Sequence, residues 1–163
     1  MADEKKYIII MIESLRKKES LLDTLLVKNE AQAACIMGKE YGDIKWDSFQ
    51  VLMAEKDTAI DRINELDDGF EALYVRVKDV LQGNKQAYAE EIRTMQELIK
   101  RITDKGMAIR AGEEANRRSI ERILGSAKQE IRQSKASVKV ASDYYKTMSK
   151  MTTAEPRFLD QKK

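Results

Sequence analysis

Carboxylates in adjacent pairs are the first candidates for acid–base chemistry in this chain. The pairs are Asp67-Asp68, Glu90-Glu91 and Glu113-Glu114. Neighbouring residues on a helix point about 100° apart, so the two members of a pair do not converge on one substrate. We interpret all three pairs as solvated surface charges and predict no catalytic residue among them.

Nucleophilic and metal chemistry also lack the residues they need. The sequence has no histidine, which excludes Cys–His and Ser–His nucleophiles and His-containing zinc sites. Gly106 and Gly112 stand in helical phase and do not follow a strand, so no glycine-rich phosphate loop is indicated. We therefore expect a protein that is not an enzyme and that has no cofactor and no metal.

The single cysteine and the N-terminal sequence bear on the compartment. Cys35 stands alone in a run of small apolar residues, which suits a reducing, intracellular environment. The only apolar run near the start covers residues 8–12, too short for a signal peptide or a membrane span. The prediction is a cytoplasmic protein without membrane insertion.

Helical periodicity dominates the elements that would position any site. Charged residues make up 36% of the chain and Pro156 is its one proline, a composition typical of long helices. Apolar residues at helical spacing predict a first helix over about 3–38 and a second over about 47–82, capped by Asp47 or Ser48. The second pattern continues in phase through Gly69, which favours one uninterrupted helix.

The third periodic stretch begins at about residue 85 and is much longer than the first two. It would measure roughly 95 Å as one helix, against about 50 Å for each of the others. We predict an all-α fold, an antiparallel up-down-up bundle of three long helices in which 85–120 is the third. The third helix would extend beyond the bundle as a coiled-coil-like arm. Residues 1–120 would form the bundle, and 121–163 an amphipathic helical extension with a disordered tail; whether the chain extends or folds back at Gly125 stays open.

The C-terminal part of this third stretch, from about residue 116, carries the candidate partner-binding site. Methionine and tyrosine, which adapt to partner surfaces, share one face with aliphatic residues. Helix-on-helix binding of another protein is one interpretation; burial by fold-back or by a second copy is another, and a basic amphipathic helix on a membrane surface is a third. The candidate partner-binding residues are Asn116, Ile120, Ile123, Leu124, Ile131, Val138, Ala141, Tyr144, Tyr145, Met148 and Met151.

Charge is unevenly distributed along the chain. Residues 105–163 hold 14 Lys and Arg against 7 Asp and Glu, a net +7, which leaves −5 for residues 1–104. The basic half is either a solvated helix face or an electrostatic binding surface. No nucleic-acid-binding motif is present, and we expect no nucleic-acid partner.

Several stretches together resemble a known family. They are Leu21-Leu22-Asp23-Thr24-Leu25-Leu26, Phe49-x-x-Leu52-x-x-Glu55-Lys56 followed by Ile60-x-x-Ile63-x-x-Leu66, Asn116 with Ile120, Ile123 and Leu124, and the run from Ala141 to Met148. With the three-helix plan, they are similar to the FlgN family of flagellar export chaperones. Coverage is most of the chain, and each motif alone is of low specificity.

The resemblance implies a cytoplasmic chaperone of flagellar type III export. Such proteins hold hook–filament junction subunits of the FlgK and FlgL type, prevent premature assembly and deliver them to the export gate. The cargo-binding helix would lie at about 116–151, and the protein would be a monomer or weak homodimer. Two alternatives are a chaperone for another flagellar subunit, such as the filament cap protein, and a structural coiled-coil protein that dimerises through its tail. Polar residues and glycines interrupt the heptads, which favours transient binding over permanent pairing.

Overall fold

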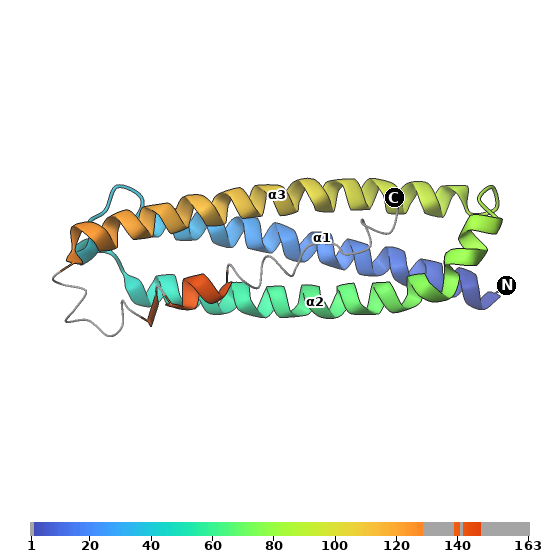
Figure 1. Cartoon of the computed structure of the whole chain (residues 1–163), viewed down its shortest axis with the longest axis horizontal. Helices are drawn as coiled ribbons and strands as arrows, with labels where there is room; N and C mark the ends of the chain where they lie inside the picture. Colours follow the sequence, from blue (N-terminus) through green and yellow to red (C-terminus); the bar gives the residue numbers. More distant parts are fainter. Residues whose placement is uncertain (1, 129–138, 141, 148–163) are drawn as a thin grey trace.

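Three long helices account for most of the residues that the structure describes. The computed structural model describes residues 2–128, 139–140 and 142–147, and this part of the chain is helical and contains no strand. The predicted all-helical class is confirmed. Figure 1 shows a rod in which the second helix runs back beside the first and the third returns in the direction of the first.

The element bounds lie close to those expected from periodicity. They are α1 (Ala2–Ile36), the short 3-10 turn η1 (Tyr41–Asp43), α2 (Trp46–Gly83) and α3 (Ala89–Ser126). As predicted, α2 passes through Gly69 without a break. The predicted cap at Asp47 or Ser48 is wrong, because the helix begins one residue before Asp47 and Lys45 precedes it. Asp47 instead lies in the first turn, where its charge suits the helix dipole.

The end of α1 depends on one glycine. Gly38 has φ +67°, a left-handed backbone conformation that residues with a Cβ rarely adopt. The amide of Met37 donates to the carbonyl of Ala33 at 2.8 Å, and the amide of Lys39 donates to that of Ile36 at 3.2 Å. These bonds satisfy carbonyls that the helix end would otherwise leave unpaired, so the chain turns sharply toward α2.

Helix α1 packs against both α2 and α3, and the interior falls into two clusters along the rod. Burial of each large aliphatic or aromatic side chain stabilises the fold by about 1.5–3 kcal/mol relative to leaving it exposed. The larger cluster, the main core, includes Ile8, Met11, Leu15, Leu25, Ile60, Ile63, Phe70, Val77, Ile99, Ile102 and Ile109. The smaller one, the end cluster, lies near η1 and consists of Ile36, Ile44, Phe49, Met53, Ile120, Ile123, Val140 and Tyr144.

Buried polar residues interrupt the apolar face of α1. Lys18 is 1% exposed, and its ammonium lies 2.6 Å from a carboxylate oxygen of Asp67 on α2. The side-chain amide of Asn29 donates to the carbonyl of Ile109 at 3.2 Å, and the side-chain amide of Asn116 donates to the backbone carbonyl of Asn29 at 3.1 Å; Ile109 and Asn116 both belong to α3. These long-range bonds fix the register of α1 against its two neighbours.

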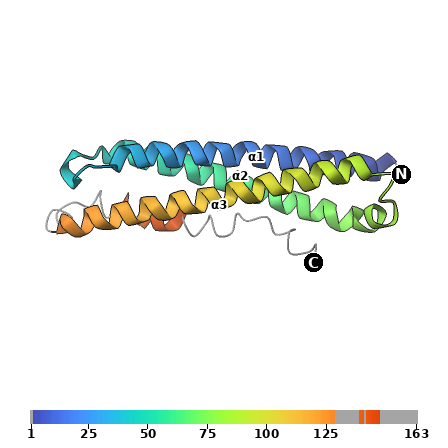
Figure 2. The same ribbon diagram turned by 90° about the horizontal axis from the view of Figure 1, so that it is seen from above.

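The course of the chain after α3 corrects the predicted arm. The helix continues through the predicted boundary at residue 120 and ends at Ser126, where the amide of Ala127 donates to the carbonyl of Ile123 at 3.1 Å. The described residues beyond it lie against the bundle: Figure 1 shows them beside α2, and Figure 2 shows them beside α3. Of the two courses left open at Gly125, the described part of the chain takes the fold-back.

Candidate partner-binding site

The candidate site is the place where the folded-back chain meets the bundle. Residues 139–140 and 142–147, called the tail segment below, are helical. Val140, Tyr144 and Thr147 are buried, at 0%, 1% and 0% exposure, and their spacing of four and three residues places them on one helical face. Tyr145, on the opposite side, is 50% exposed. The tail segment is therefore attached through a narrow stripe of side chains.

Tyr144 is the main anchor of the tail segment. Its ring stacks on Phe49 of α2 with centroids 6.1 Å apart and an angle of 27°. Its hydroxyl donates a short hydrogen bond to the backbone carbonyl of Glu113 on α3. Burial, with the negative charge of Glu113 nearby, raises the pKa of the Tyr144 phenol far above its usual range. The hydroxyl consequently stays protonated and acts as a donor that ties the tail to two helices at once.

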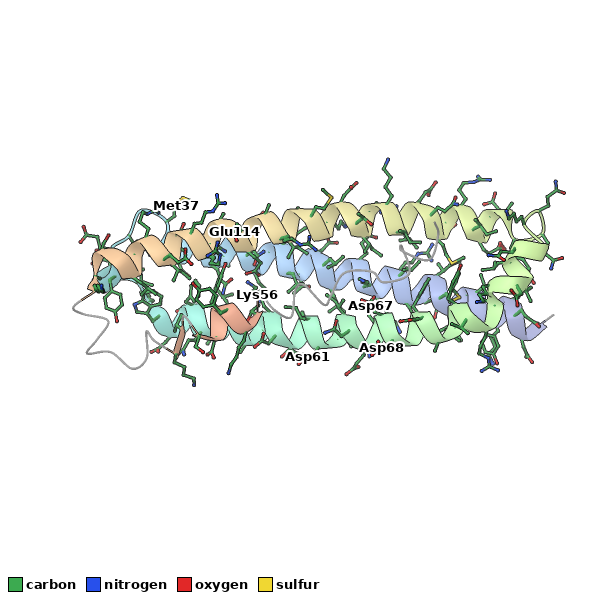
Figure 3. All side chains as sticks on the ribbon, in the orientation of Figure 1. Met37, Lys56, Asp61, Asp67, Asp68 and Glu114 are labelled. Carbon is green, nitrogen blue, oxygen red and sulfur yellow. The ribbon has the colours of Figure 1, made fainter. Side chains whose placement is uncertain are left out.

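A buried ion pair lies directly beneath this ring. Lys56 of α2 and Glu113 of α3 form a close salt bridge, and their side chains are 0% and 1% exposed. The Lys56 ammonium also donates to Gln32 of α1 at 2.7 Å and lies 5.4 Å from the centroid of the Tyr144 ring. Burial lowers the pKa of Lys56, and the Glu113 carboxylate opposes that shift. Figure 3 shows Lys56 on the inner side of α2. The pair joins α1, α2, α3 and the tail at one point.

Two further hydrogen bonds fasten the tail segment at its margins. Thr147 donates to a carboxylate oxygen of Asp57 on α2 at 2.9 Å. Tyr145 donates to the carboxylate of Glu121 on α3 at 2.7 Å, and this bond raises the pKa of the Tyr145 phenol. Unlike the buried hydrogen bond of Tyr144, the hydrogen bond of Tyr145 is exposed to water. It contributes less to the stability of the docked tail, because water competes for exposed hydrogen bonds.

The predicted partner-binding residues do not form one open surface in this conformation. Asn116, Ile120 and Ile123 are buried in α3, and Leu124 is half-buried against the end cluster. Tyr144 is buried, so Tyr145 is the one described member that is largely exposed. The remaining predicted residues lie outside the described part of the chain; they are Ile131, Val138, Ala141, Met148 and Met151.

The interpretation of the acidic pairs as surface charges is wrong for one member of two pairs. Asp67 is buried against Lys18, and Glu113 is buried against Lys56, whereas Asp68 is exposed and Glu114 is only half-buried. Figure 3 shows Asp67 on the inner side of α2 and Asp68 on its outer side. The divergence of neighbours expected for a helix is thus present, and it separates structural charges from surface ones.

The sequence analysis missed the residues of α2 that contact the tail segment: Phe49, Lys56 and Asp57. One signal was available, because Lys56 occupies an apolar phase position between Met53 and Ile60. A lysine at such a position is buried and needs a partner carboxylate. On α3, Glu113 likewise lies in phase with the apolar residues Ile109 and Ile120. The pattern thus marks both charges as buried, and the structure shows that they pair with each other.

The described residues contain no group of three or more metal-ligating side chains that could hold a metal ion. Across the same residues, none of the helices combines the length and apolarity needed to cross a membrane. Comparisons with protein-family models, with curated proteins and with solved structures find no match to this chain.

Proposed function

We propose that the chain is a non-enzymatic, cytoplasmic chaperone of flagellar export. In this proposal it binds hook–filament junction subunits of the FlgK and FlgL type through its C-terminal segment, prevents their premature assembly and delivers them to the type III export apparatus. The resemblance to the FlgN family supports the cargo class. The docked tail segment supports the mode of binding.

The observation that carries the proposal is the separateness of the tail from the main core. None of the residues of the main core belongs to the tail segment, whereas Val140 and Tyr144 complete the end cluster. A helix held by three buried side chains can leave without disrupting α1, α2 and the first half of α3. The tail segment is thus suited to exchange its contact on the bundle for a contact with another helix.

The chemistry beneath Tyr144 makes this exchange reversible. Burying an ion pair costs several kcal/mol of desolvation, which the mutual attraction only partly offsets. When the tail segment leaves, water solvates Lys56 and Glu113 again, and this solvation offsets part of the free energy of undocking. The free energy of undocking is therefore smaller than the buried area alone suggests. A cargo helix that covers Tyr144 and Val140 replaces the apolar contacts that the bundle gives up.

Calorimetry with a purified junction subunit tests the proposal. The full chain should bind the subunit, and Tyr145→Ala should weaken binding by about tenfold, because Tyr145 is the large hydrophobic side chain that the described tail exposes to a partner. Met37→Ala is the matched control, since Met37 is 73% exposed and is not among the predicted partner-binding residues.

Two results would reject the proposal. One is the absence of binding to any junction subunit, and the other is an equal loss of affinity in Tyr145→Ala and Met37→Ala. Light scattering on the free chain distinguishes the dimerising alternative, which requires a stable dimer where the proposal requires a monomer or weak homodimer.

A further inference from the structure

The second half of α2 and the first half of α3 border a cleft that the tail segment does not reach. The cleft has a volume of about 560 Å³. It lies near the α2–α3 connection, whereas the tail segment docks near η1 (Figure 1). Its floor combines the buried residues Met11, Phe70, Leu81, Met95 and Ile99 with the half-buried Tyr74 and Ile92.

The rim of this cleft is basic. Three cationic residues line it, Lys78 and Lys85 on the α2 side and Arg93 on the α3 side, and no acidic residue is among the lining residues. Arg93 pairs at 3.6 Å with Glu90, and both of these side chains are largely exposed. Positive charge around an apolar floor selects a partner that presents an apolar stripe flanked by carboxylates.

The length of the cleft matches that of a helix of about three turns. From Phe70 to Leu81 the α2 wall extends over about 16 Å at the rise of an α-helix. Between the same two helices, the tail segment already places Tyr144 on Phe49 and bonds it to Glu113. The space between α2 and α3 therefore accepts a short helix at one end, and the cleft offers the same two walls at the other.

Charge decides between the available occupants. Residues 148–163 carry Lys150, Arg157, Lys162 and Lys163 against Glu155 and Asp160. Their net charge is therefore positive, like that of the rim, which disfavours them as the occupant. A second copy of the chain brings an identical basic rim. We infer that the cleft between Phe70–Leu81 and Ile92–Ile99 docks an acidic amphipathic helix of a different protein. This inference does not depend on the proposed cargo of the tail.

A pair of designed peptides tests the inference on the full-length chain. The first is an amphipathic helix of about 14 residues, or about four turns, with leucines on one face and glutamates beside them. The second has lysine at every glutamate position. Methyl signals of Met11 and Met95 report on the cleft, and those of Met37 and Met107, which are exposed, report on other surfaces.

We expect the acidic peptide to shift the Met11 and Met95 signals and to bind about tenfold more tightly than the basic one, because two or three exposed ion pairs each add a modest factor. The double variant Lys78→Glu/Lys85→Glu should abolish or reverse the preference. Lys39→Glu/Lys45→Glu, which changes net charge equally at exposed positions in another region, should retain it. Added salt should reduce the preference.

Each contrary outcome would overturn the inference. Equal affinity for both peptides removes the role of the rim, and shifts confined to Met37 or Met107 place binding elsewhere. Concentration-dependent Met11 and Met95 signals in the free chain would identify a second copy as the occupant. A change in those signals on deletion of residues 148–163 would identify the chain's own C-terminal segment.

Discussion

Tyr144→Ala should release the tail segment while the rest of the bundle stays folded. The substitution removes a 1% exposed ring that stacks on Phe49, together with the hydroxyl that bonds the Glu113 carbonyl. Truncating a buried aromatic residue costs about 3–5 kcal/mol, of which about 1 kcal/mol is the hydrogen bond. Only Val140 and Thr147 then remain as buried contacts of the described tail, too few to hold a short helix in place.

Amide hydrogen exchange measures this release directly. A loss of about 3 kcal/mol corresponds to exchange about 100-fold faster, so residues 139–147 should approach the rate of an unstructured peptide. The amides of α1 and α2 within the main core should keep their protection. Emission of Trp46, the one tryptophan, should also change, because its ring lies 6.0 Å from that of Phe49.

Tyr145→Ala is the matched control for this experiment. It removes a neighbouring tyrosine that is 50% exposed and makes one exposed hydrogen bond to Glu121. Its effect on tail exchange should be less than about tenfold, because exposed bonds contribute about 1 kcal/mol or less. Equal acceleration by the two variants, or unchanged protection in Tyr144→Ala, would refute the anchor assigned to Tyr144.

Three further predictions concern the bundle. Glu113→Gln should lower the free energy of unfolding by about 3–5 kcal/mol, because it leaves the Lys56 ammonium buried without its counter-charge; Lys56→Met together with Glu113→Leu should recover most of the loss in chemical denaturation. Gly106→Ala should stabilise α3 by about 0.5–1 kcal/mol, since nothing lies within 4 Å of the added Cβ, whereas at Gly112 the Cβ would lie 3.2 Å from the Asn29 amide and the thermal midpoint should fall below that of Gly106→Ala. The hydrogen bond from Arg101, with Lys105 nearby, lowers the pKa of Glu19 to about 2, so its stabilising contribution, complete above pH 5, should disappear as the pH falls toward 2; Glu19→Gln should remove this part, about 1 kcal/mol or less, from pH-dependent melting curves.

Local periodicity was sufficient to predict the long helices. The apolar phase on both sides of Gly69 predicted a single α2, and one glycine costs only about 1 kcal/mol against the packing of a whole face. Helix ends were less accurate. The α3 start at Ala89, four residues later than expected, follows a turn in which the amide of Tyr88 donates to the carbonyl of Asn84 at 3.2 Å.

The periodicity within one helix could not predict which buried polar groups would pair with each other. Lys18 and Asp67 are 49 positions apart, and each interrupts a different helix. Their contact depends on the relative rotation and register of α1 and α2, which periodicity within either helix does not determine. The same holds for Lys56 and Glu113. Consequently the sequence indicated that these charges were out of place but not which partner each would find.

The direction of the tail required tertiary information as well. Its apolar periodicity is equally compatible with an extending arm and with a helix packed on the bundle, since both bury one face. Which of the two courses the tail takes depends on the contacts that Phe49, Lys56 and Glu113 offer to Tyr144. These three residues come together only when α2 and α3 have folded next to each other. The sequence therefore predicted which tail residues share one helical face. It did not predict that this face is buried against the bundle.

A distance measurement tests the central claim, that the tail segment exchanges the bundle for a cargo helix. Spin labels at Ala54→Cys on α2 and Lys146→Cys on the tail, both exposed positions, with Cys35→Ser to remove the native thiol, report their separation. The account predicts one short distance in the free chain and a longer one when a purified hook–filament junction subunit is bound. An unchanged short distance in a saturated complex would contradict it.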